Sequence, residues 1–218
     1  MTGAAVMAGR AALHFGAGAV GVASPKRDTV AALGPELLTY AIDDLEGLCR
    51  RYDVVVVGPG LGDLPDVVAT VTEHAAAVVA DADALADRDL LEAARGRLVI
   101  TPHAGEFGRL TDHHPGPDGA GTLAREMGCV VLLKGWPTFV TDGGVPWAVV
   151  SGGPELATIG TGDVLAGMIA ALWARGLDPI DAARSAAFWH GVAAAELAEQ
   201  TTATADRLAY HVGRYAGV

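Results

Sequence analysis

Short apolar runs alternate along the chain with stretches of helical spacing, and this alternation constrains the fold more than any other sequence feature. A continuous run rich in Val, Ile, Leu and Ala is typical of a strand buried on both faces of a parallel sheet. We predict strands at residues 17–24, 53–58, 77–81, 98–101 and 129–134, and helices at residues 5–15, 64–74, 89–95, 105–111 and 119–127. This order predicts βαβ units with right-handed crossovers.

The pattern changes in the C-terminal part of the chain. Residues 138–141 and 146–151 flank an Asp-Gly-Gly-Val turn, which predicts a β-hairpin. Helical spacing then dominates residues 161–175, 179–200 and 205–215. A chain of 218 residues is long enough to bury one sizeable core as a single domain. The predicted fold class is therefore α/β, with a mainly parallel central sheet followed by a hairpin and helices.

The composition restricts the classes of partner. The formal net charge is −11, which repels nucleic acids and anionic membranes, so we expect neither as a partner. No apolar run reaches the roughly 20 residues that span a bilayer, and the first residues lack a signal-peptide pattern. These features predict a cytoplasmic protein. A nucleotide is compatible with the charge, because backbone amides at a loop or helix start bind phosphate locally.

Glycines and carboxylates follow two of the predicted strands. Residues 58–62 read Gly-Pro-Gly-Leu-Gly, and three glycines in five residues let the backbone approach a ligand closely. Asp81 and Asp83 close the strand at 77–81, and the carboxyl ends of strands form the ligand-binding edge of an open parallel sheet. Each motif also has a simpler interpretation. The glycine loop is consistent with a tight turn, and each aspartate is consistent with a helix N-cap.

Two further motifs lie at the same predicted edge. His103 and Glu106 follow the strand at 98–101 and are three residues apart at a helix start, near enough to share one site. No third ligand with suitable spacing lies nearby, which argues against a transition-metal site. Singly, these side chains are equally consistent with solvent exposure or capping. Lys134 ends the strand at 129–134 and either extends into solvent or pairs with a phosphate beside Gly135.

Residues 160–163, Gly-Thr-Gly-Asp, are the most informative stretch because they lead directly into a strongly apolar helix. The unpaired amides and the dipole of a helix start make an anion site, and Asp163 lies in the first turn beside it. In the simpler interpretation, Thr161 caps the helix and Asp163 complements its dipole. That interpretation leaves the glycines unexplained. A base beside a transferring phosphoryl group accounts for all four residues.

His190 lies within an apolar helical stretch, and this position gives little indication of a catalytic role. We interpret it as a packing histidine with satisfied hydrogen bonds rather than as a catalyst.

The order of the motifs is more specific than any one of them. Gly-Pro-Gly-Leu-Gly, Asp-Ala-Asp-Ala-Leu, Thr-Pro-His-Ala-Gly-Glu-Phe, Leu-Lys-Gly-x-x-Thr and Gly-Thr-Gly-Asp-Val-Leu-Ala-Gly follow one another. Over residues 2–196 this series resembles the NAD(P)H-hydrate dehydratase family, the C-terminal module of some bifunctional cofactor-repair proteins. The resemblance implies a ribokinase-like, three-layer α/β/α fold. His103 favours this family over the related vitamin kinases, which carry Asn there, whereas the Gly-Thr-Gly-Asp loop is shared across the superfamily.

The resemblance also implies an activity and a set of site residues. ADP or ATP donates phosphate to the hydroxyl of hydrated NADH or NADPH, and loss of that phosphate regenerates the reduced nicotinamide; the enzyme is a lyase that repairs a metabolite. Asp163 is the implied base, and Glu106 is implied to position Mg²⁺ through water. The implied anion hole is Gly160, Thr161 and Gly162. The implied nucleotide-binding residues are Lys134, Gly135, Trp136, Pro137, Thr138 and Gly162. The implied hydrate-binding residues are Ala4, Gly60, His103 and Asp163.

The chain departs from the family at three places. Family members begin with a strand and a glycine-containing loop ahead of the segment equivalent to residues 2–5, and both are absent here. A misassigned start codon or a truncation accounts for this, and we expect the sheet to expose apolar surface and unpaired backbone. Residues 152–155 read Gly-Gly-Pro-Glu where the family tends to have Asn-Pro-Gly, and Ile159 replaces the first glycine of Gly-Gly-Thr-Gly-Asp. These two changes weaken nucleotide contacts without removing the base.

Two other functions stay open from sequence. The first is a ribokinase-like kinase of a thiazole or pyrimidine alcohol, which releases a phosphorylated alcohol instead of inorganic phosphate. The second is a non-catalytic nucleotide-binding or assembly subunit. The retention of Lys134, His103, Glu106 and Asp163 argues against this second function. We expect a homo-oligomer, since the helices are rich in Ala and a sheet edge is exposed. We also expect cooperation with an NAD(P)H-hydrate epimerase.

Overall fold

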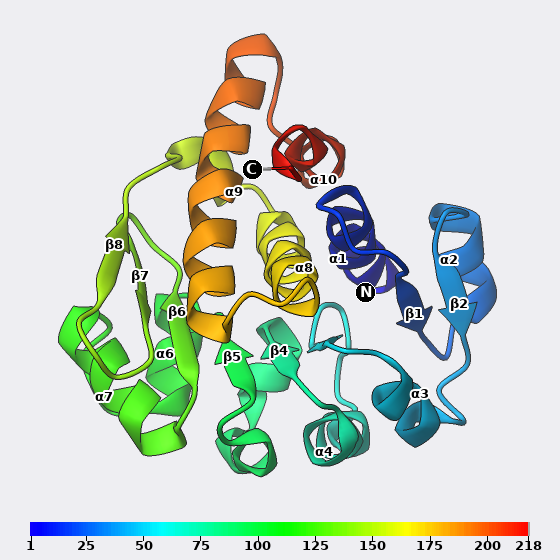
Figure 1. Cartoon of the computed structure of the whole chain (residues 1–218), viewed down its shortest axis with the longest axis horizontal. Helices are drawn as coiled ribbons and strands as arrows, with labels where there is room; N and C mark the ends of the chain where they lie inside the picture. The colour runs from blue at the N-terminus through cyan, green and yellow to red at the C-terminus, as the bar shows by residue number, and fades with distance from the viewer. Residues whose placement is uncertain (218) are drawn as a thin grey trace.

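The computed structural model describes residues 1–217, and its strands form two adjacent sheets (Figure 1). β1 (Gly21–Ala23) and β2 (Leu38–Tyr40) pair in parallel as a two-stranded sheet. The larger sheet has the order β3-β4-β5-β6-β7-β8, parallel from β3 to β6 and antiparallel from β6 to β8. Its strands are β3 (Val55–Val57), β4 (Val78–Ala80), β5 (Leu98–Ile100), β6 (Val130–Leu133), β7 (Thr138–Thr141) and β8 (Trp147–Val149).

Helices cover both faces of the sheets and make three layers (Figure 1). The helices on one face are α1 (Thr2–His14), α8 (Thr161–Ala174), α9 (Pro179–Gln200) and α10 (Ala205–His211). Those on the other are α3 (Leu45–Arg51), α4 (Pro65–His74), α6 (Ala104–Leu110) and α7 (Pro117–Met127). This α/β/α arrangement, with its mostly parallel sheet and its β7–β8 hairpin, confirms the predicted fold class.

The central elements follow from their apolar sequences. β4, β5 and β6 consist wholly of buried residues, as their continuous apolar runs predict. α8 is apolar almost all round and is buried along most of its length. Gly167 lets α1 cross α8 closely, since a Cβ at this position would overlap the carbonyl oxygen of Ala8. α8 is thereby held against β3 and β4, and its first turn lies at the carboxyl edge of the larger sheet.

Some elements differ from the sequence prediction. The segment at 27–51 contains α2 (Arg27–Leu33), β2 and α3; of these only α3 has a sequence signal, a helical pattern that ends near Cys49. Each spans only three or seven residues and buries few side chains, so its hydrophobic period is weak. The helix predicted at 89–95 is divided into α5 (Arg88–Leu91) and a 3₁₀ turn (Glu92–Ala94). Within residues 1–217, none of the helices is both long enough and apolar enough to cross a membrane.

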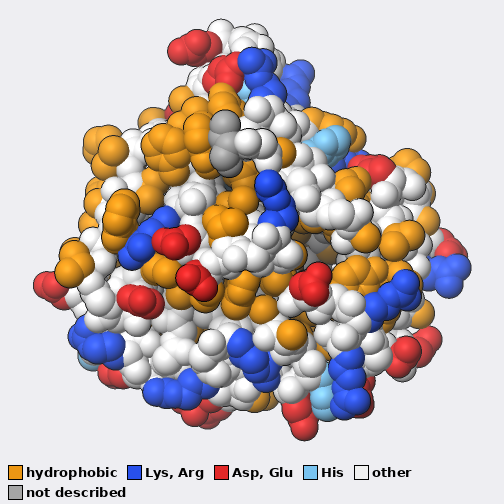
Figure 2. Space-filling view, viewed as in Figure 1, with side chains coloured by type: hydrophobic (Ala, Val, Ile, Leu, Met, Phe, Trp, Pro, Cys, Tyr) orange, Lys and Arg blue, Asp and Glu red, His pale blue; other side chains and the backbone are white. Residues whose placement is uncertain are grey.

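Charged side chains do not gather into one large field on the face drawn in Figure 2. Acidic and basic side chains are interspersed there, with apolar side chains between them. The net negative charge of the chain is therefore spread over this surface instead of forming a single acidic patch.

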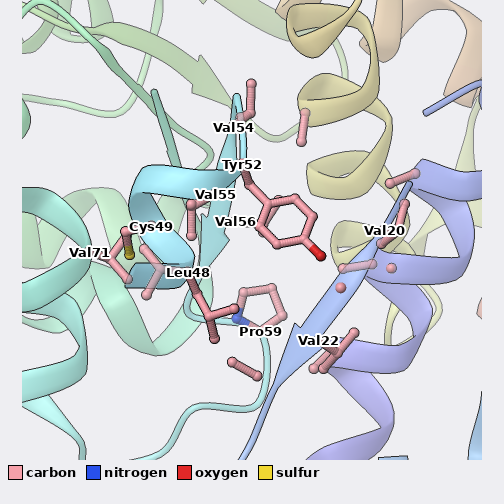
Figure 3. A pocket seen from close by; sticks show the side chains of 18 of the residues that line it. Val20, Val22, Leu48, Cys49, Tyr52, Val54, Val55, Val56, Pro59 and Val71 are labelled. Carbon is pink, nitrogen blue, oxygen red and sulfur yellow. The ribbon is translucent and has the colours of Figure 1, made fainter. Parts of the chain in front are cut away.

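A groove of about 240 Å³ separates β1 from β3, so the two sheets do not join (Figure 3). Its walls are mostly apolar and include Val22, Leu48 and Val56. Tyr52 reaches from the end of α3 into the groove, and its hydroxyl donates a hydrogen bond to that of Tyr40 over 3.0 Å. Burial and this hydrogen bond raise the pKa of Tyr52 to about 12. The groove therefore combines an apolar lining with one buried polar bridge.

Backbone groups on both sides of this groove have the pattern of free strand edges. The carbonyl of Val20 accepts from Leu38 on β2, so the alternation of a strand points the amide and carbonyl of Gly21 toward the groove. On the other side, the amide of Val55 bonds to Ala77 next to β4, which points the backbone groups of Val56 toward the groove. An extended segment lying between the two edges would satisfy both.

We predict that an added strand stabilises this groove. Met1 lies against Gly60, just past the carboxyl end of β3, so a segment placed ahead of it can enter the groove and run parallel to β3. Six β-branched apolar residues added there should raise the thermal midpoint by several degrees. For a domain of this size each kcal/mol shifts the midpoint by about 2–4 °C. An extension of six alternating Gly and Ser residues is the control, and equal midpoints for the two proteins would contradict the prediction.

Candidate active site

The start of α8 presents backbone amides without partners. Gly160 precedes the helix with φ of +91°, a conformation that favours glycine, and no side chain caps the helix. The hydroxyl of Thr161 donates to the carbonyls of Leu156 and Thr158 over 2.7 and 2.8 Å, so it does not cap as the simpler interpretation supposed. Among the described residues, the amides of Gly162 and Asp163 have no acceptor. These amides and the helix dipole form an anion-binding position.

An ion pair joins the ends of two strands beside this position. Lys134 follows β6, Asp81 follows β4, and the Lys134 Nζ lies 2.7 Å from Asp81 Oδ1. The Asp81 side chain is only 2% exposed, whereas that of Lys134 is 22% exposed. Lys134 also lies 3.6 Å from Glu106 Oε2. The cation is therefore held by two carboxylates at the carboxyl edge of the sheet. Sequence analysis placed both Asp81 and Lys134 at this edge but did not pair them.

Glycine at position 162 permits the ion pair to lie against α8. A Cβ there would be 3.3 Å from the Lys134 Nζ and 3.5 Å from Asp81 Oδ2. A side chain there would therefore crowd the ammonium, which would have to move by a few tenths of an ångström. The structure thus brings Lys134 and the predicted anion hole together.

Asp163 occupies the same corner and has a perturbed ionisation. Burial is the main cause that raises the pKa of its carboxyl to about 6, and the neighbouring charge of Asp81 raises it further. Lys134 and the N-terminal ammonium of Met1 act in the opposite direction. A carboxylate with a pKa near neutrality is suited to accept a proton during a reaction.

His103 and Glu106 form a reciprocal cap at the start of α6. The Nδ1 of His103 accepts from the amides of Gly105 and Glu106 over 2.9 and 3.1 Å, and Glu106 Oε2 accepts from the amide of His103 over 2.8 Å. His103 and Glu106 thus lie together as a cap of α6, the simpler interpretation left open from sequence, and their binding of a ligand stays a prediction. Because Nδ1 is an acceptor, the neutral ring carries its proton on Nε2. The His103 side chain is 57% exposed, and its Nε2 lies 3.4 Å from Glu106 Oε1.

The glycine loop after β3 meets the start of the chain. Gly60 has φ of +66°, and a Cβ there would overlap the backbone of Met1. The amide of Ala4 donates to the Met1 carbonyl over 3.1 Å, which places Ala4 one turn from this loop. Asp83 accepts from the amide of Gly62 over 2.8 Å, so its carboxylate holds the loop instead of capping a helix. The predicted hydrate-binding positions therefore lie along one edge of the sheet.

A cavity of about 670 Å³ opens beside the first turn of α8. It contains most of the predicted nucleotide-binding residues, with Pro137 absent from its wall. The rest of the wall comes from the loop after β8 and from the helix α9. The residues assigned to the anion hole or the nucleotide from sequence are Lys134, Gly135, Trp136, Thr138, Thr161 and Gly162. Residues 152–154 belong to the segment whose sequence departs from the family, and the wall residues without any sequence signal include Ser151, Leu156 and His190. The loop and α9 meet the other residues only through tertiary packing.

Metal-binding side chains are sparse at this edge. Within residues 1–217, no three His, Cys, Asp or Glu side chains lie close enough together to hold a metal ion. Both oxygens of Glu106 are already engaged, one by the His103 amide and the other 3.4 Å from His103 Nε2. Asp81 is committed to Lys134. The site therefore lacks a cage for a resident Mg²⁺, which ordinarily takes one or two carboxylates together with phosphate oxygens.

Comparison with known proteins identifies the family. Residues 1–214 match the NAD(P)H-hydrate dehydratase family. The chain belongs to this family. It is 36% identical over 244 residues to the bifunctional NAD(P)H-hydrate repair enzyme Nnr of Pyrobaculum aerophilum, which covers 99% of this chain and 49% of that protein. The chain thus spans about half the length of this bifunctional relative.

Two shorter relatives of the NAD(P)H-hydrate dehydratase family match more of their own length. The ADP-dependent (S)-NAD(P)H-hydrate dehydratase of Xanthomonas campestris pv. campestris is 34% identical over 224 residues, covering 91% of this chain and 77% of that protein. The ADP/ATP-dependent NAD(P)H-hydrate dehydratase of Bacillus subtilis, co-crystallized with ATP/Mg²⁺, has a TM-score of 0.81 at 26% identity. That match covers 98% of this chain and 84% of the solved chain. The ribokinase-like resemblance found from the motifs is confirmed.

The ion pair yields a stability prediction. Lys134→Met leaves the Asp81 carboxylate buried without its cation and should lower the free energy of unfolding by about 3 kcal/mol in urea titrations. Asp81→Asn in the same chain should recover part of that loss. Lys26→Met, which removes an exposed lysine, is the matched control. Equal losses for the two lysine variants would show that the pair does not hold the site together.

Proposed function

We propose that the chain dehydrates NADH or NADPH hydrate, with ADP or ATP as phosphoryl donor, as a cofactor-repair lyase. The observation that carries this proposal is the position of Asp163, a carboxyl with a pKa raised to about 6 beside unpartnered amides and a lysine. Family membership and the names of the relatives supply the substrate class.

The first step is phosphoryl transfer. The terminal phosphate of the nucleotide lies at the start of α8, where the amides of Gly162 and Asp163 and the Lys134 ammonium stabilise its negative charge. The ionised Asp163 takes the proton from the substrate hydroxyl as that oxygen bonds to phosphorus. The bond from phosphorus to the leaving nucleotide breaks, and AMP or ADP departs. The role of the protein here is to position groups and stabilise charge.

The second step is elimination of the phosphate from the phosphorylated hydrate. The carbon–oxygen bond breaks, a proton leaves the adjacent ring carbon, and the reduced nicotinamide ring is restored. His103 follows β5 at the same edge of the sheet and is 57% exposed, and its Nε2 donor hydrogen-bonds to a polar group of the hydrate in place of its contact with Glu106. Gly60 and Ala4 complete the wall, since both lie next to Met1 at the same edge.

Magnesium enters this proposal as part of the nucleotide substrate. Its phosphate oxygens supply most of the ligands, because the described residues offer no cage for the ion. Glu106 contacts it only through water, since both carboxylate oxygens already have protein partners. The ion supplies charge neutralisation of the phosphates when bound.

We also propose a homo-oligomer that acts in the cytoplasm beside an NAD(P)H-hydrate epimerase. The bifunctional character named for the Pyrobaculum aerophilum relative supports that partnership. The two cysteines, Cys49 and Cys129, are both free and buried, which suits a reducing compartment.

We predict that the protein restores the absorbance of reduced nicotinamide to NADH hydrate in the presence of Mg²⁺ and ADP or ATP. Asp163→Asn should lower the rate by about 10² to 10⁴, the range for loss of a general base. Asp118→Asn, at the first turn of α7, removes a matched exposed carboxylate and should leave the rate unchanged. Release of a phosphorylated alcohol with no phosphate would identify a vitamin-type kinase instead.

The raised pKa of Asp163 gives the sign of two pH effects. Activity should fall about tenfold per pH unit below pH 6, because the protonated carboxyl cannot accept a proton. The pKa of Asp163 in the folded protein exceeds the ordinary value of 3.8. The contribution of Asp163 to stability is therefore fully present below pH 3.8 and is lost as the pH rises through about 6. The gain in thermal midpoint of Asp163→Asn over the original protein should thus be larger at pH 8 than at pH 5. A gain that shrinks with rising pH would contradict this.

A further inference from the structure

His190 lies deep inside the molecule and still faces the cavity beside α8. It belongs to α9 and is only 5% exposed. It shares the wall of the 670 Å³ cavity with Lys134, Thr161 and Gly162. His190 therefore lines the same cavity as Lys134, Thr161 and Gly162, but it lies on α9, which carries none of these three residues.

The imidazole has an unsatisfied nitrogen. Within residues 1–217, the buried Nε2 of His190 has no hydrogen-bond partner. The expectation that the hydrogen bonds of His190 are all satisfied therefore fails at Nε2, while the expectation that it is no catalyst stays a prediction. A buried polar atom left unpaired ordinarily destabilises a fold by about 1–3 kcal/mol, so such atoms are rare and call for a ligand or a function.

The ring is uncharged near neutral pH. Burial is the main cause that lowers the pKa of His190 to about 4; a hydrogen bond between the ring and the backbone of Thr161 raises it, and the charge of Lys134 lowers it further. A neutral imidazole offers one donor and one acceptor and no charge. Such a group suits an uncharged polar partner better than a phosphate, which the lysine and the free amides already serve.

Close backbone packing fixes where the imidazole lies. A Cβ on Gly191 would overlap the carbonyl of Ser151, so α9 touches the loop after β8 directly. The hydroxyl of Ser151 also donates to the carbonyl of Phe188 over 2.8 Å. Helix and loop are thereby held together at the residue next to His190, and the ring is fixed in the wall of the cavity.

The remainder of the wall indicates what lies opposite the ring. Away from Lys134 and Gly162, the lining is largely apolar and comes from Pro154, Leu156, Ala157, Leu165 and Ala187. With the phosphates at the start of α8, this part of the cavity receives the sugar and base. We propose that His190 Nε2 hydrogen-bonds to the nucleoside moiety of the phosphoryl donor, to a sugar hydroxyl or a base nitrogen, and so positions the nucleotide; this rests on the function proposed above.

Calorimetric titration of the free protein with ADP and with pyrophosphate tests the proposal. His190→Leu removes the ring nitrogens at similar volume and should weaken ADP binding roughly tenfold, while pyrophosphate binding stays unchanged. His190→Gln, which places a polar atom close to Nε2, should restore most of the affinity for ADP. Titration with 2′-deoxy-ADP and 3′-deoxy-ADP distinguishes the possible partners of Nε2. If one analogue binds the original protein and His190→Leu equally well, the sugar hydroxyl missing from that analogue is the partner. If both analogues still bind His190→Leu more weakly than the original protein, the partner is a base nitrogen.

Thermal unfolding separates this role from a structural one. Because Nε2 is unpaired in the free protein, His190→Leu should keep or raise the thermal midpoint while it weakens ADP binding. His211→Leu is the matched control. The His211 side chain is 12% exposed and its Nε2 lies 3.5 Å from Glu196 Oε2. Because His211 lies on α10 outside the cavity, the ADP affinity of this variant should not change.

Four results would overturn the proposal. Unchanged ADP affinity in His190→Leu would refute the hydrogen bond while the proposed function stands. Equal losses for ADP and pyrophosphate, or a lower thermal midpoint, would make His190 a packing residue. An original protein that binds pyrophosphate but no nucleotide would refute the proposed function together with this inference.

Discussion

The ion pair between Lys134 and Asp81 is the interaction on which the site depends. It joins the carboxyl ends of β6 and β4 across β5, and it lies against the first turn of α8 because residue 162 is glycine. The Lys134 ammonium therefore connects the ends of two strands with the start of a helix. The Asp81 carboxylate is 2% exposed, so its charge is tolerable only while the ammonium stays in place. The Lys134 ammonium thus lies both beside the free amides of α8 and in the ion pair at the sheet edge.

The same corner contains groups that the fold does not fully satisfy. Asp163 is held at a raised pKa by burial and by Asp81, the first-turn amides of α8 have no acceptor, and His190 has a free nitrogen. Each of these destabilises the free protein slightly, and each becomes favourable once a phosphorylated ligand or a proton arrives. Functional sites commonly concentrate such groups, because a surface that is already satisfied has little to offer a ligand.

The groove between β1 and β3 shows a different kind of incompleteness. Its two edges carry backbone groups that no strand satisfies, and its lining is apolar. The larger sheet does not depend on it, since β3 to β8 and the helices α8 and α9 form their own core. The candidate active site lies between the groove and the larger sheet. Gly60 and Met1 contact each other near the carboxyl end of β3, next to the groove, whereas Lys134 and α8 pack with the larger sheet.

The sequence by itself determined the strands β3 to β6, the hairpin, the long C-terminal helices and the residues that end each strand. Continuous apolar runs and glycine-rich turns are local signals, so they can be read without knowing the partners. Only the tertiary structure decided that Asp81 pairs with Lys134, and that α9 brings a histidine with an unpaired nitrogen into the wall of the cavity beside α8. The weak elements α2 and β2 were also invisible, since each is short and largely exposed. Pairing, burial and pKa depend on which segments meet in space, and no local pattern carries that information.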